Sequence, residues 1–148
     1  MNISQTSKYA LRGLAHMAIQ SEHTATRTQD LSTETGIPMH YLSKIMRRLV
    51  TEGLLKSQKG HGGGFVFARD ISEIYLADIL RVFNPKVDEE ACVFGRETCD
   101  SENPCILHDF WDDLQGSINT WSEKYTLRDV ANRVGILNER PGSDLREK

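Results

Sequence analysis

The chain has no run of about 18 or more apolar residues, so no membrane-spanning helix is expected. Its N-terminus, MNISQTSKYALRGLAHMA, lacks the basic start, apolar centre and cleavage site of a signal peptide. Cysteine is scarce, and an odd count of three cannot pair fully within one chain. These absences predict a cytoplasmic protein, in which clustered cysteines hold metal more often than they form disulfides.

Charge is distributed unevenly along the 148 residues. Residues 1–61 carry eight Lys or Arg against four Asp or Glu, a net charge of +4. Residues 62–148 carry ten basic and seventeen acidic residues, a net charge of −7. The N-terminal part could therefore bind a polyanion despite the acidic total, although two solvated faces of opposite sign are an equal alternative.

Three helices are predicted in the N-terminal part of the chain. The first spans about residues 3–20, where apolar residues recur at helical spacing. Thr28 can cap a short second helix over 29–35. Pro38 suits the first turn of a third helix, over about 38–53, because its missing N–H would be unpaired there.

The third predicted helix has two distinct faces. Its apolar side consists of Leu42, Ile45, Met46, Leu49 and Val50. Its other side is basic and rich in hydrogen-bonding groups, which suit phosphates and base edges. A short helix, a tight turn at GIP and such a helix form the helix-turn-helix layout. The residues predicted to contact DNA in and before this helix are Thr28, Pro38, His40, Tyr41, Ser43, Lys44 and Arg47.

A β-hairpin is predicted next, because the segments LLKSQ and FVFA flank the sequence KGHGGG. Consecutive glycines supply positive φ angles without steric cost at a hairpin tip. A hairpin directly after a recognition helix is the wing of a winged helix, and its tip can enter a minor groove. The predicted contacts there are Lys59, Gly60, His61 and Gly62. A nucleotide-phosphate loop is disfavoured because Phe65, and not Gly-Lys-Ser/Thr, follows the glycines.

The C-terminal half is predicted to contain a helix over 75–83, a long helix over about 105–125 and a further helix that Thr126 and Asp129 can cap. Apolar residues in the long helix recur at alternating steps of four and three, a heptad seam. The seam residues are Leu107, Trp111, Leu114, Ile118, Trp121 and Tyr125. The seam favours a dimerisation helix, and the alternative packs it on its own domain.

All three cysteines lie in one acidic stretch, CVFGRETCDSENPCILH. Acidic neighbours raise the pKa of a thiol and argue against a catalytic cysteine, and no third residue is identifiable to orient Cys105 and His108 as a nucleophile–base pair. A bound metal would supply the positive charge that deprotonates thiols regardless of acidic neighbours. The candidate metal ligands are Cys92, Cys99, Cys105 and His108.

Two kinds of metal group suit this donor set. Zinc would accept it as a closed tetrahedral site, but zinc ligands usually come in tight pairs. The gaps of six and five residues between the cysteines suit a larger iron–sulfur cluster, and Cys105 and His108 are predicted to be neighbours on one helix face. The spacing therefore favours a cluster over zinc. A surface role for His108 and a metal-free thiol sensor remain as alternatives.

With these residues identified, the sequence resembles the iron–sulfur cluster regulators of bacteria, the IscR- and NsrR-type winged-helix family, over roughly residues 1–137. The resemblance rests on SKYALRGL, on TGIPMHYLSKIMRRLVTEGLLKSQKGHGGGF and on the three cysteines ahead of the long helix. It implies a homodimer that binds a partly palindromic double-stranded DNA operator, with a cluster that tunes the DNA affinity. It also implies a 2Fe–2S cluster held by three cysteines and a histidine.

Two departures limit this resemblance. In NsrR-type relatives an acidic residue of the first helix supplies the non-cysteine ligand, and Lys8 stands at that position here. Lys8 thus favours His108 as the fourth ligand, or a 4Fe–4S cluster attached by three thiols. Ser43 stands where IscR carries a Glu, so the operator preference is not carried over.

The sequence therefore predicts a mostly α-helical transcription regulator, with repression as its expected mode, and not an enzyme. Its expected parts are a winged helix-turn-helix domain over 1–83, a cluster-binding loop over 84–104, a dimerisation helix with the following helix over 105–137, and a disordered tail over 138–148.

Overall fold

The computed structural model describes residues 3–20, 23–84, 92–96 and 99–138. Helices dominate, and the described strands form one two-stranded antiparallel sheet, which confirms the mostly α-helical fold class with a β-hairpin. In chain order the elements are α1 (Gln5–Gln20), α2 (Thr28–Thr35), α3 (Met39–Thr51), β1 (Leu55–Gln58), β2 (Gly64–Phe67), the 3-10 helix η1 (Ile71–Glu73), α4 (Leu76–Phe83), α5 (His108–Lys124) and α6 (Leu127–Asn138).

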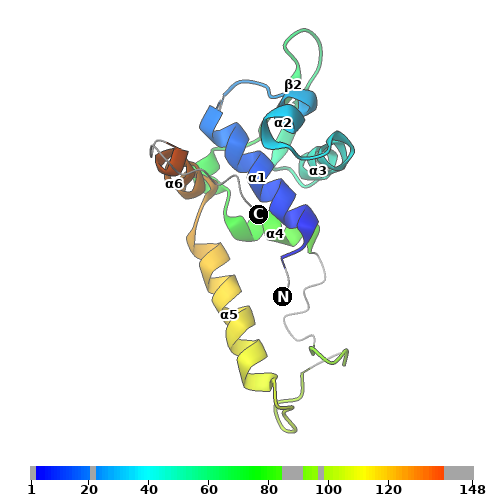
Figure 1. The fold of residues 1–148 in the computed structure, drawn as a ribbon, viewed down its shortest axis with the longest axis vertical. Helices are drawn as coiled ribbons and strands as arrows, with labels where there is room; N and C mark the ends of the chain where they lie inside the picture. Colours follow the sequence, from blue (N-terminus) through cyan, green and yellow to red (C-terminus); the bar gives the residue numbers. More distant parts are fainter. Residues whose placement is uncertain (1–2, 21–22, 85–91, 97–98, 139–148) are drawn as a thin grey trace.

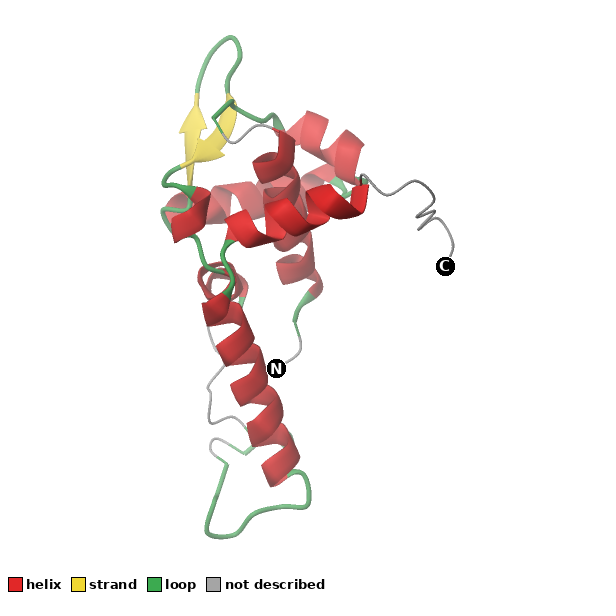
Figure 2. Ribbon diagram, turned by 90° about the vertical axis from the view of Figure 1, so that its left-hand side faces the viewer, coloured by secondary structure: helices red, strands yellow, loops and turns green. Residues whose placement is uncertain are grey.

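The molecule consists of a head and a stalk. The head contains α1 to α4, the β-hairpin and α6, and α5 forms the stalk (Figure 1). The hairpin projects from one end of the head and α5 from the other, so the two protrusions point in opposite directions (Figure 2). At about 1.5 Å per residue, the 17 residues of α5 are about 25 Å long.

The core of the head forms around α1, which packs against α2, α3, α4 and α6. Leu14 and Met17 of α1 are almost fully buried, because apolar residues recur on one side of this helix. From α3, the buried residues are Leu42, Ile45, Met46 and Leu49. The predicted apolar face of α3 is therefore confirmed, with Val50 half-buried at its edge.

The base of the stalk is tied to the head by backbone hydrogen bonds. The Leu76 N–H donates to the Tyr125 carbonyl at 3.0 Å, and the Leu127 N–H donates to the Ile74 carbonyl at 2.8 Å. The two bonds form a short antiparallel bridge between Tyr75 and Thr126, just after the end of α5. A change in the direction of the stalk would therefore have to break backbone hydrogen bonds or move the head with it.

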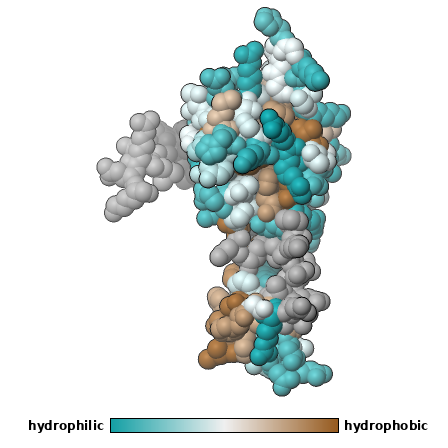
Figure 3. All heavy atoms as spheres, turned by 90° about the vertical axis from the view of Figure 1, so that its right-hand side faces the viewer, coloured by the Kyte–Doolittle hydropathy of each residue, from teal (hydrophilic) through white to brown (hydrophobic). Residues whose placement is uncertain are grey.

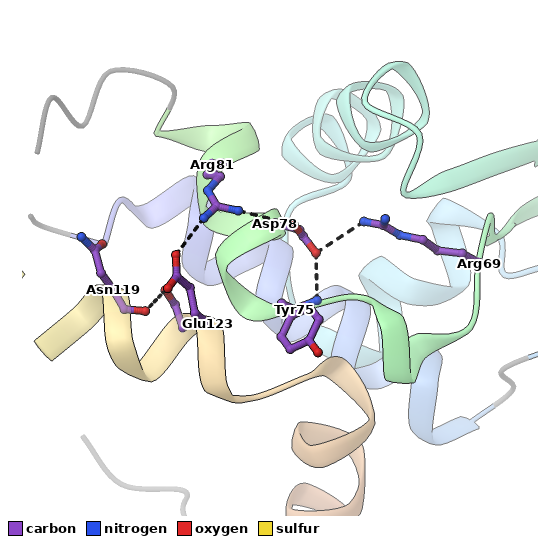
Figure 4. Close-up of polar contacts among 7 residues, drawn as sticks. Arg69, Tyr75, Asp78, Arg81, Asn119 and Glu123 are labelled. Atoms are coloured by element: carbon purple, nitrogen blue, oxygen red, sulfur yellow. Dashed lines mark hydrogen bonds and ion pairs between the residues drawn. The ribbon is translucent and has the colours of Figure 1, made fainter. Parts of the chain in front are cut away.

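Charged side chains extend this joint across α4 (Figure 4). Arg81 of α4 contacts Glu123 of α5 at 3.0 Å. Asp78 of α4 accepts a hydrogen bond from the Tyr75 N–H at 2.9 Å and pairs with Arg69, which follows β2, at 3.4 Å. Exposed ion pairs contribute little individually. Together they nevertheless connect the base of the wing to the base of the stalk.

Two predicted helix starts are wrong. Thr28 is the first helical residue of α2, and Arg27 occupies the N-cap without a side-chain cap bond. Arg27 has the extended backbone conformation that is typical of an N-cap residue, because Thr26, directly before it, is held in a β-bridge with Phe65. The long helix begins at His108 and not near 105, so Cys105 lies in the turn before it.

Some predicted segments lie wholly or partly outside the described residues. The tail predicted over 138–148 does so apart from Asn138, and the loop predicted over 84–104 is described only in part. In the ranges that are described, no helix combines the length and the apolar character needed to cross a lipid bilayer.

Replacing Gly64 with Ala is expected to destabilise the head by about 2 kcal/mol. The φ of Gly64 is 152°, and a Cβ there would lie 2.5 Å from the Thr26 carbonyl oxygen. Gly62→Ala is the matched control, since its φ is 74° but no atom lies within 4 Å of the added Cβ. Urea unfolding measures the free energy of unfolding of both variants. An equal decrease in the two variants would show that the clash with Thr26 does not lower stability.

Candidate nucleic-acid interface and metal centre

The outward face of α3 presents the side chains that the sequence singles out. His40, Tyr41, Lys44 and Arg47 are exposed, and Ser43 is half-buried. They are placed there because the apolar residues of α3 turn the opposite side of the helix into the core. The recognition-helix residues thus share one solvent-facing surface, which Pro38 precedes as the exposed N-cap residue.

Aromatic contacts position the start of α3. The rings of His40 and Tyr41 lie 4.3 Å apart, and the Tyr41 ring lies 5.7 Å from that of Tyr9 on α1. Tilted ring pairs at such distances are favourable. Tyr41 is therefore held against α1 while 46% of its surface stays exposed, which leaves its outer edge available to a partner.

The wing is a hairpin in which Gln58 pairs with Gly64 and Leu55 with Phe67. Gly60 and Gly62 have positive φ values of 91° and 74°, as predicted for the tip. Lys59 and His61 are exposed there. The predicted contacts on the wing thus lie together at the most protruding part of the head (Figure 2).

Some cations of the head are paired with acidic side chains. Arg48 pairs with Glu52 at 3.1 Å and Arg69 pairs with Asp78 at 3.4 Å. By contrast, no ion pair within the described ranges engages a second set, which consists of Arg27, Lys44, Arg47, Lys56 and Lys59. The second set lies on α3, on the wing and on the segment before α2, so these elements carry positive charge that no described acid pairs with. Lys8 and Arg12 of α1 and Arg133 of α6 also form no ion pair among the described residues.

The four predicted metal ligands line one small pocket, of about 80 Å³, at the far end of the stalk. The pocket is formed by the described parts of the cysteine loop and the first residue of α5. The further lining residues are Phe94, Arg96, Asp100 and Asn103. Asp100 fixes the loop by accepting hydrogen bonds from the Glu102 and Asn103 backbone N–H groups at 2.9 and 3.2 Å.

Within this pocket, His108 contacts a different cysteine from the one predicted. Its Nδ1 lies 3.2 Å from the Sγ of Cys99, whereas Cys105 meets His108 through its carbonyl, which accepts the His108 N–H at 3.1 Å. The prediction that Cys105 and His108 share a helix face is wrong, because the helix starts only at His108. The loop folds Cys99 back onto the helix instead.

The thiols differ in their electrostatic surroundings. Hydrogen bonding from the Phe94 backbone N–H, and then from that of Arg96, lowers the pKa of Cys92. Burial raises the pKa of the Cys99 thiol, and the neighbouring Cys92 charge adds to that effect. Three thiols so close together repel one another as thiolates, so a bound cation would relieve this repulsion.

The donors surround the pocket but do not converge on a point. Over the residues described, no three His, Cys, Asp or Glu side chains are placed to hold one metal ion. Three thiols and an imidazole around a common pocket nevertheless have the chemistry of an iron–sulfur ligand set. The donor types suit an iron–sulfur cluster, and they also suit a zinc ion.

Apolar side chains are exposed along the stalk, including two residues that the heptad pattern does not include. Ile106 is 95% exposed and Phe110 is 64% exposed, at the far end of the stalk where apolar side chains gather (Figure 3). Of the predicted seam, Trp121 is exposed, whereas the half-buried members are Leu107, Trp111, Leu114, Ile118 and Tyr125.

At its base the stalk bears an apolar pocket of about 300 Å³. Trp121 and Tyr125 of α5, Leu76 of α4 and Val130 of α6 line it, with Asp129 and Arg133 at its edge. Tyr125 also packs against the core of its own head. The alternative in which the seam packs on its own domain therefore applies to Tyr125, while Trp121 stays open.

These features define a class of protein: a winged helix-turn-helix DNA-binding protein with a helical stalk. The sequence pattern of the Rrf2 family, described as an iron-dependent transcriptional regulator, matches residues 3–133. The chain belongs to the Rrf2 family of transcriptional regulators.

Relatives and solved structures agree with this assignment. The transcriptional regulator IscR of Photorhabdus laumondii is 30% identical over 138 residues, covering 93% of this chain and 84% of that protein. IscR of Yersinia pestis is 30% identical over 148 residues, covering 99% and 90%. The predicted resemblance to IscR-type regulators is confirmed, and so is the expectation of a transcription regulator that is not an enzyme, because the family and these relatives are regulators.

Solved structures show the same fold at lower identity. The global cysteine regulator CymR of B. subtilis superposes with a TM-score of 0.75 at 24% identity, over 90% of this chain and 98% of that one. T. potens IscR also gives 0.75, at 20% identity, over 96% and 94%. The winged helix-turn-helix architecture predicted from the sequence is therefore confirmed.

Proposed function

We propose that the chain regulates transcription through an iron–sulfur cluster held by Cys92, Cys99, Cys105 and His108. The observation that carries the proposal is that these four donors line one pocket at the far end of α5. The description of the matched family as iron-dependent is in accord with it. Four protein donors favour a 2Fe–2S cluster, and three thiols without His108 would favour 4Fe–4S.

DNA binding is assigned to the exposed face of α3 and to the wing. On this proposal His40, Tyr41, Ser43, Lys44 and Arg47 enter a major groove of the operator. The wing tip, Lys59 to Gly62, reaches the adjacent minor groove. The support is the positive charge on these two elements that no ion pair among the described residues engages.

A homodimer through α5 completes the proposed regulator. In a two-fold symmetric dimer the same two surfaces of each protomer meet in a reciprocal way. If the two α5 helices run antiparallel, the exposed Phe110 end of one protomer therefore lies against the apolar base pocket of the other, and the reverse. Asp113 near the far end and Lys124 near the base then approach with opposite charges. Gly116, exposed between them, lets the helices come close.

The head and the stalk supply the link between the two sites. When bound, a cluster would cross-link the donors of the loop and the first residue of α5 and would respond to redox state, nitric oxide or iron supply. The stalk base is hydrogen-bonded to the head through Leu76 and Leu127. If the loop packs differently against the stalks in the cluster-bound and cluster-free forms, the separation of the two heads would differ between these forms. Only such a difference between the two forms can alter the affinity for DNA.

One observation also favours a metal-free alternative. Cys92 and Cys99 line the same small pocket, and both are free thiols. A peroxide could oxidise such a pair to a disulfide by accepting the two electrons and two protons of the thiols, and a thiol reductant could reverse the step without any cluster. Iron-free protein whose DNA affinity changes on oxidation, and is restored by a thiol reductant, would support this alternative.

The proposed function is tested by comparing the cluster-loaded and cluster-free forms. A duplex selected from a random-sequence pool by the anaerobically purified protein serves as the probe. The two forms are expected to differ in affinity by about 5- to 150-fold, the range of typical allosteric coupling. Equal affinities in fluorescence anisotropy would contradict regulation by the cluster.

Replacing Lys44 or Lys59 with Ala is expected to lower the salt dependence of DNA binding. Removing a lysine that binds a phosphate reduces the slope of log K against log salt by about one unit per contact, hence about two units for a dimer with both heads bound. Arg128→Ala is the control, because Arg128 lies on α6, across α1 from α3 (Figure 1), and pairs with Asp70 at 3.6 Å. An unchanged slope in titrations of the Lys variants would remove both lysines from the contact surface.

A further inference from the structure

We propose that Arg27 is an additional DNA contact that binds the phosphate backbone between the two grooves occupied by α3 and the wing. The inference rests on the DNA-binding surface proposed above and extends it to a segment outside both elements. Neither the helix-turn-helix pattern nor the glycine-rich hairpin points to this residue.

Arg27 is held at the wing by main-chain contacts. The Thr26 N–H donates to the Phe65 carbonyl at 2.9 Å, and the Phe65 N–H donates to the Thr26 carbonyl at 2.9 Å. This isolated bridge attaches the segment before α2 to β2 of the wing. A Cβ on Gly64 would lie 3.1 Å from the Arg27 backbone nitrogen, so Arg27 directly abuts β2. Its place depends on the wing and not on a mobile loop.

The side chain of Arg27 is available to a ligand. Arg27 is exposed and, among the residues described, forms no ion pair, even though the exposed Asp30 follows three positions later in the first turn of α2. Arg12, by contrast, donates to the Thr35 carbonyl at 2.8 Å, and Arg48 pairs with Glu52 at 3.1 Å. An unpaired guanidinium on a protein surface suits bidentate contact with a phosphate.

The position of Arg27 selects phosphate over base as its ligand. It lies beside Gly64, at the end of β2 nearest the wing tip, and directly before α2, the helix that packs against α3. When a recognition helix occupies the major groove and a wing the next minor groove, a phosphate strand passes between them. Arg27 is placed at that border, so it would position the head on the duplex without reading sequence.

Fluorescence anisotropy of the full-length protein with a mixed-sequence duplex of about 40 base pairs tests the proposal, because phosphate contacts persist on non-specific DNA. Arg27→Ala is expected to lower the slope of log K against log salt by about one unit per contact, hence about two for a dimer with both heads bound. Arg27→Lys should keep most of the slope. The charge-matched control Arg128→Ala should keep all of it, and thermal unfolding verifies that each variant is folded.

The outcomes separate this inference from the function on which it rests. A wild-type slope for Arg27→Ala, in a protein that binds the duplex normally, would overturn the role of Arg27 and leave the DNA-binding surface intact. Equal losses for Arg27→Ala and Arg128→Ala would overturn it as well, because net charge alone would then explain the effect. Wild-type protein without salt-dependent binding would refute both the inference and the proposed surface.

Discussion

Cys99→Ser protein purified without oxygen is expected to contain less than about a tenth of the iron and sulfide of the wild type. Cys99 lines the pocket with the other three donors, and its Sγ lies 3.2 Å from the His108 Nδ1. A serine hydroxyl stays protonated at neutral pH and is a poor ligand for iron. Changes to residues that only support a metal ligand lower the metal affinity by about 10- to 100-fold. Removal of a ligand itself should therefore lower the affinity at least as much.

Ser101→Ala is the control for this variant, because Ser101 is an exposed residue of the same loop and does not line the pocket. Iron and acid-labile sulfide are measured per protomer in both proteins. Wild-type contents in Cys99→Ser would exclude Cys99 as a ligand.

The second large effect is expected from Phe110→Glu, which should raise the dimer dissociation constant by about 100-fold or more. Phe110 is 64% exposed in the protomer, and aromatic residues that become buried at an interface often contribute about 2 kcal/mol or more, at about 1.4 kcal/mol per tenfold change. The proposed antiparallel arrangement would also bring the introduced carboxylate to the base pocket of the partner, whose lining is mostly apolar, and burying a charge there is costly.

Sedimentation velocity over a range of protein concentrations measures this change. Gln58→Glu adds the same charge at an exposed position of β1 on the head and should leave the dimer intact. A dimer of unchanged affinity in Phe110→Glu would place the interface elsewhere. The half-buried seam residues Leu114 and Ile118 would then be the next candidates.

Much of the head could be predicted because its signals are local. The apolar spacing in α3 fixes which side is buried, and the glycines between two short β-prone segments predict the hairpin. The requirement for Gly64 could not be predicted in the same way. It depends on Thr26, a residue distant in sequence that pairs with Phe65 only in the folded chain.

The donor set of the candidate metal centre could be predicted, whereas its internal contacts could not. Composition and spacing identify three thiols and a histidine, and all four line one pocket. Helical spacing pairs His108 with Cys105, but the turn before α5 excludes that geometry and the loop brings in Cys99. Loop conformations depend on hydrogen bonds such as those of Asp100, which no periodicity reveals.

The heptad pattern likewise identifies an apolar helix without showing which part of it its own head covers. Tyr125 packs against the core, whereas Phe110 lies outside the pattern and is exposed. The hydrogen bonds at the stalk base help to determine how α5 is rotated relative to the head. The surface offered to a partner is therefore a property of the fold and not of the repeat alone.

The most direct test is an anaerobic visible and Mössbauer spectrum of the wild-type protein beside His108→Ala. The wild type is expected to be coloured, with iron bound together with sulfide, and His108→Ala is expected to give a different spectrum because an imidazole donor is removed. Identical spectra would exclude His108 as a ligand while leaving a cluster on the three thiols. A colourless wild-type protein without iron, which takes up neither iron nor sulfide, would contradict the proposal that a cluster controls this regulator.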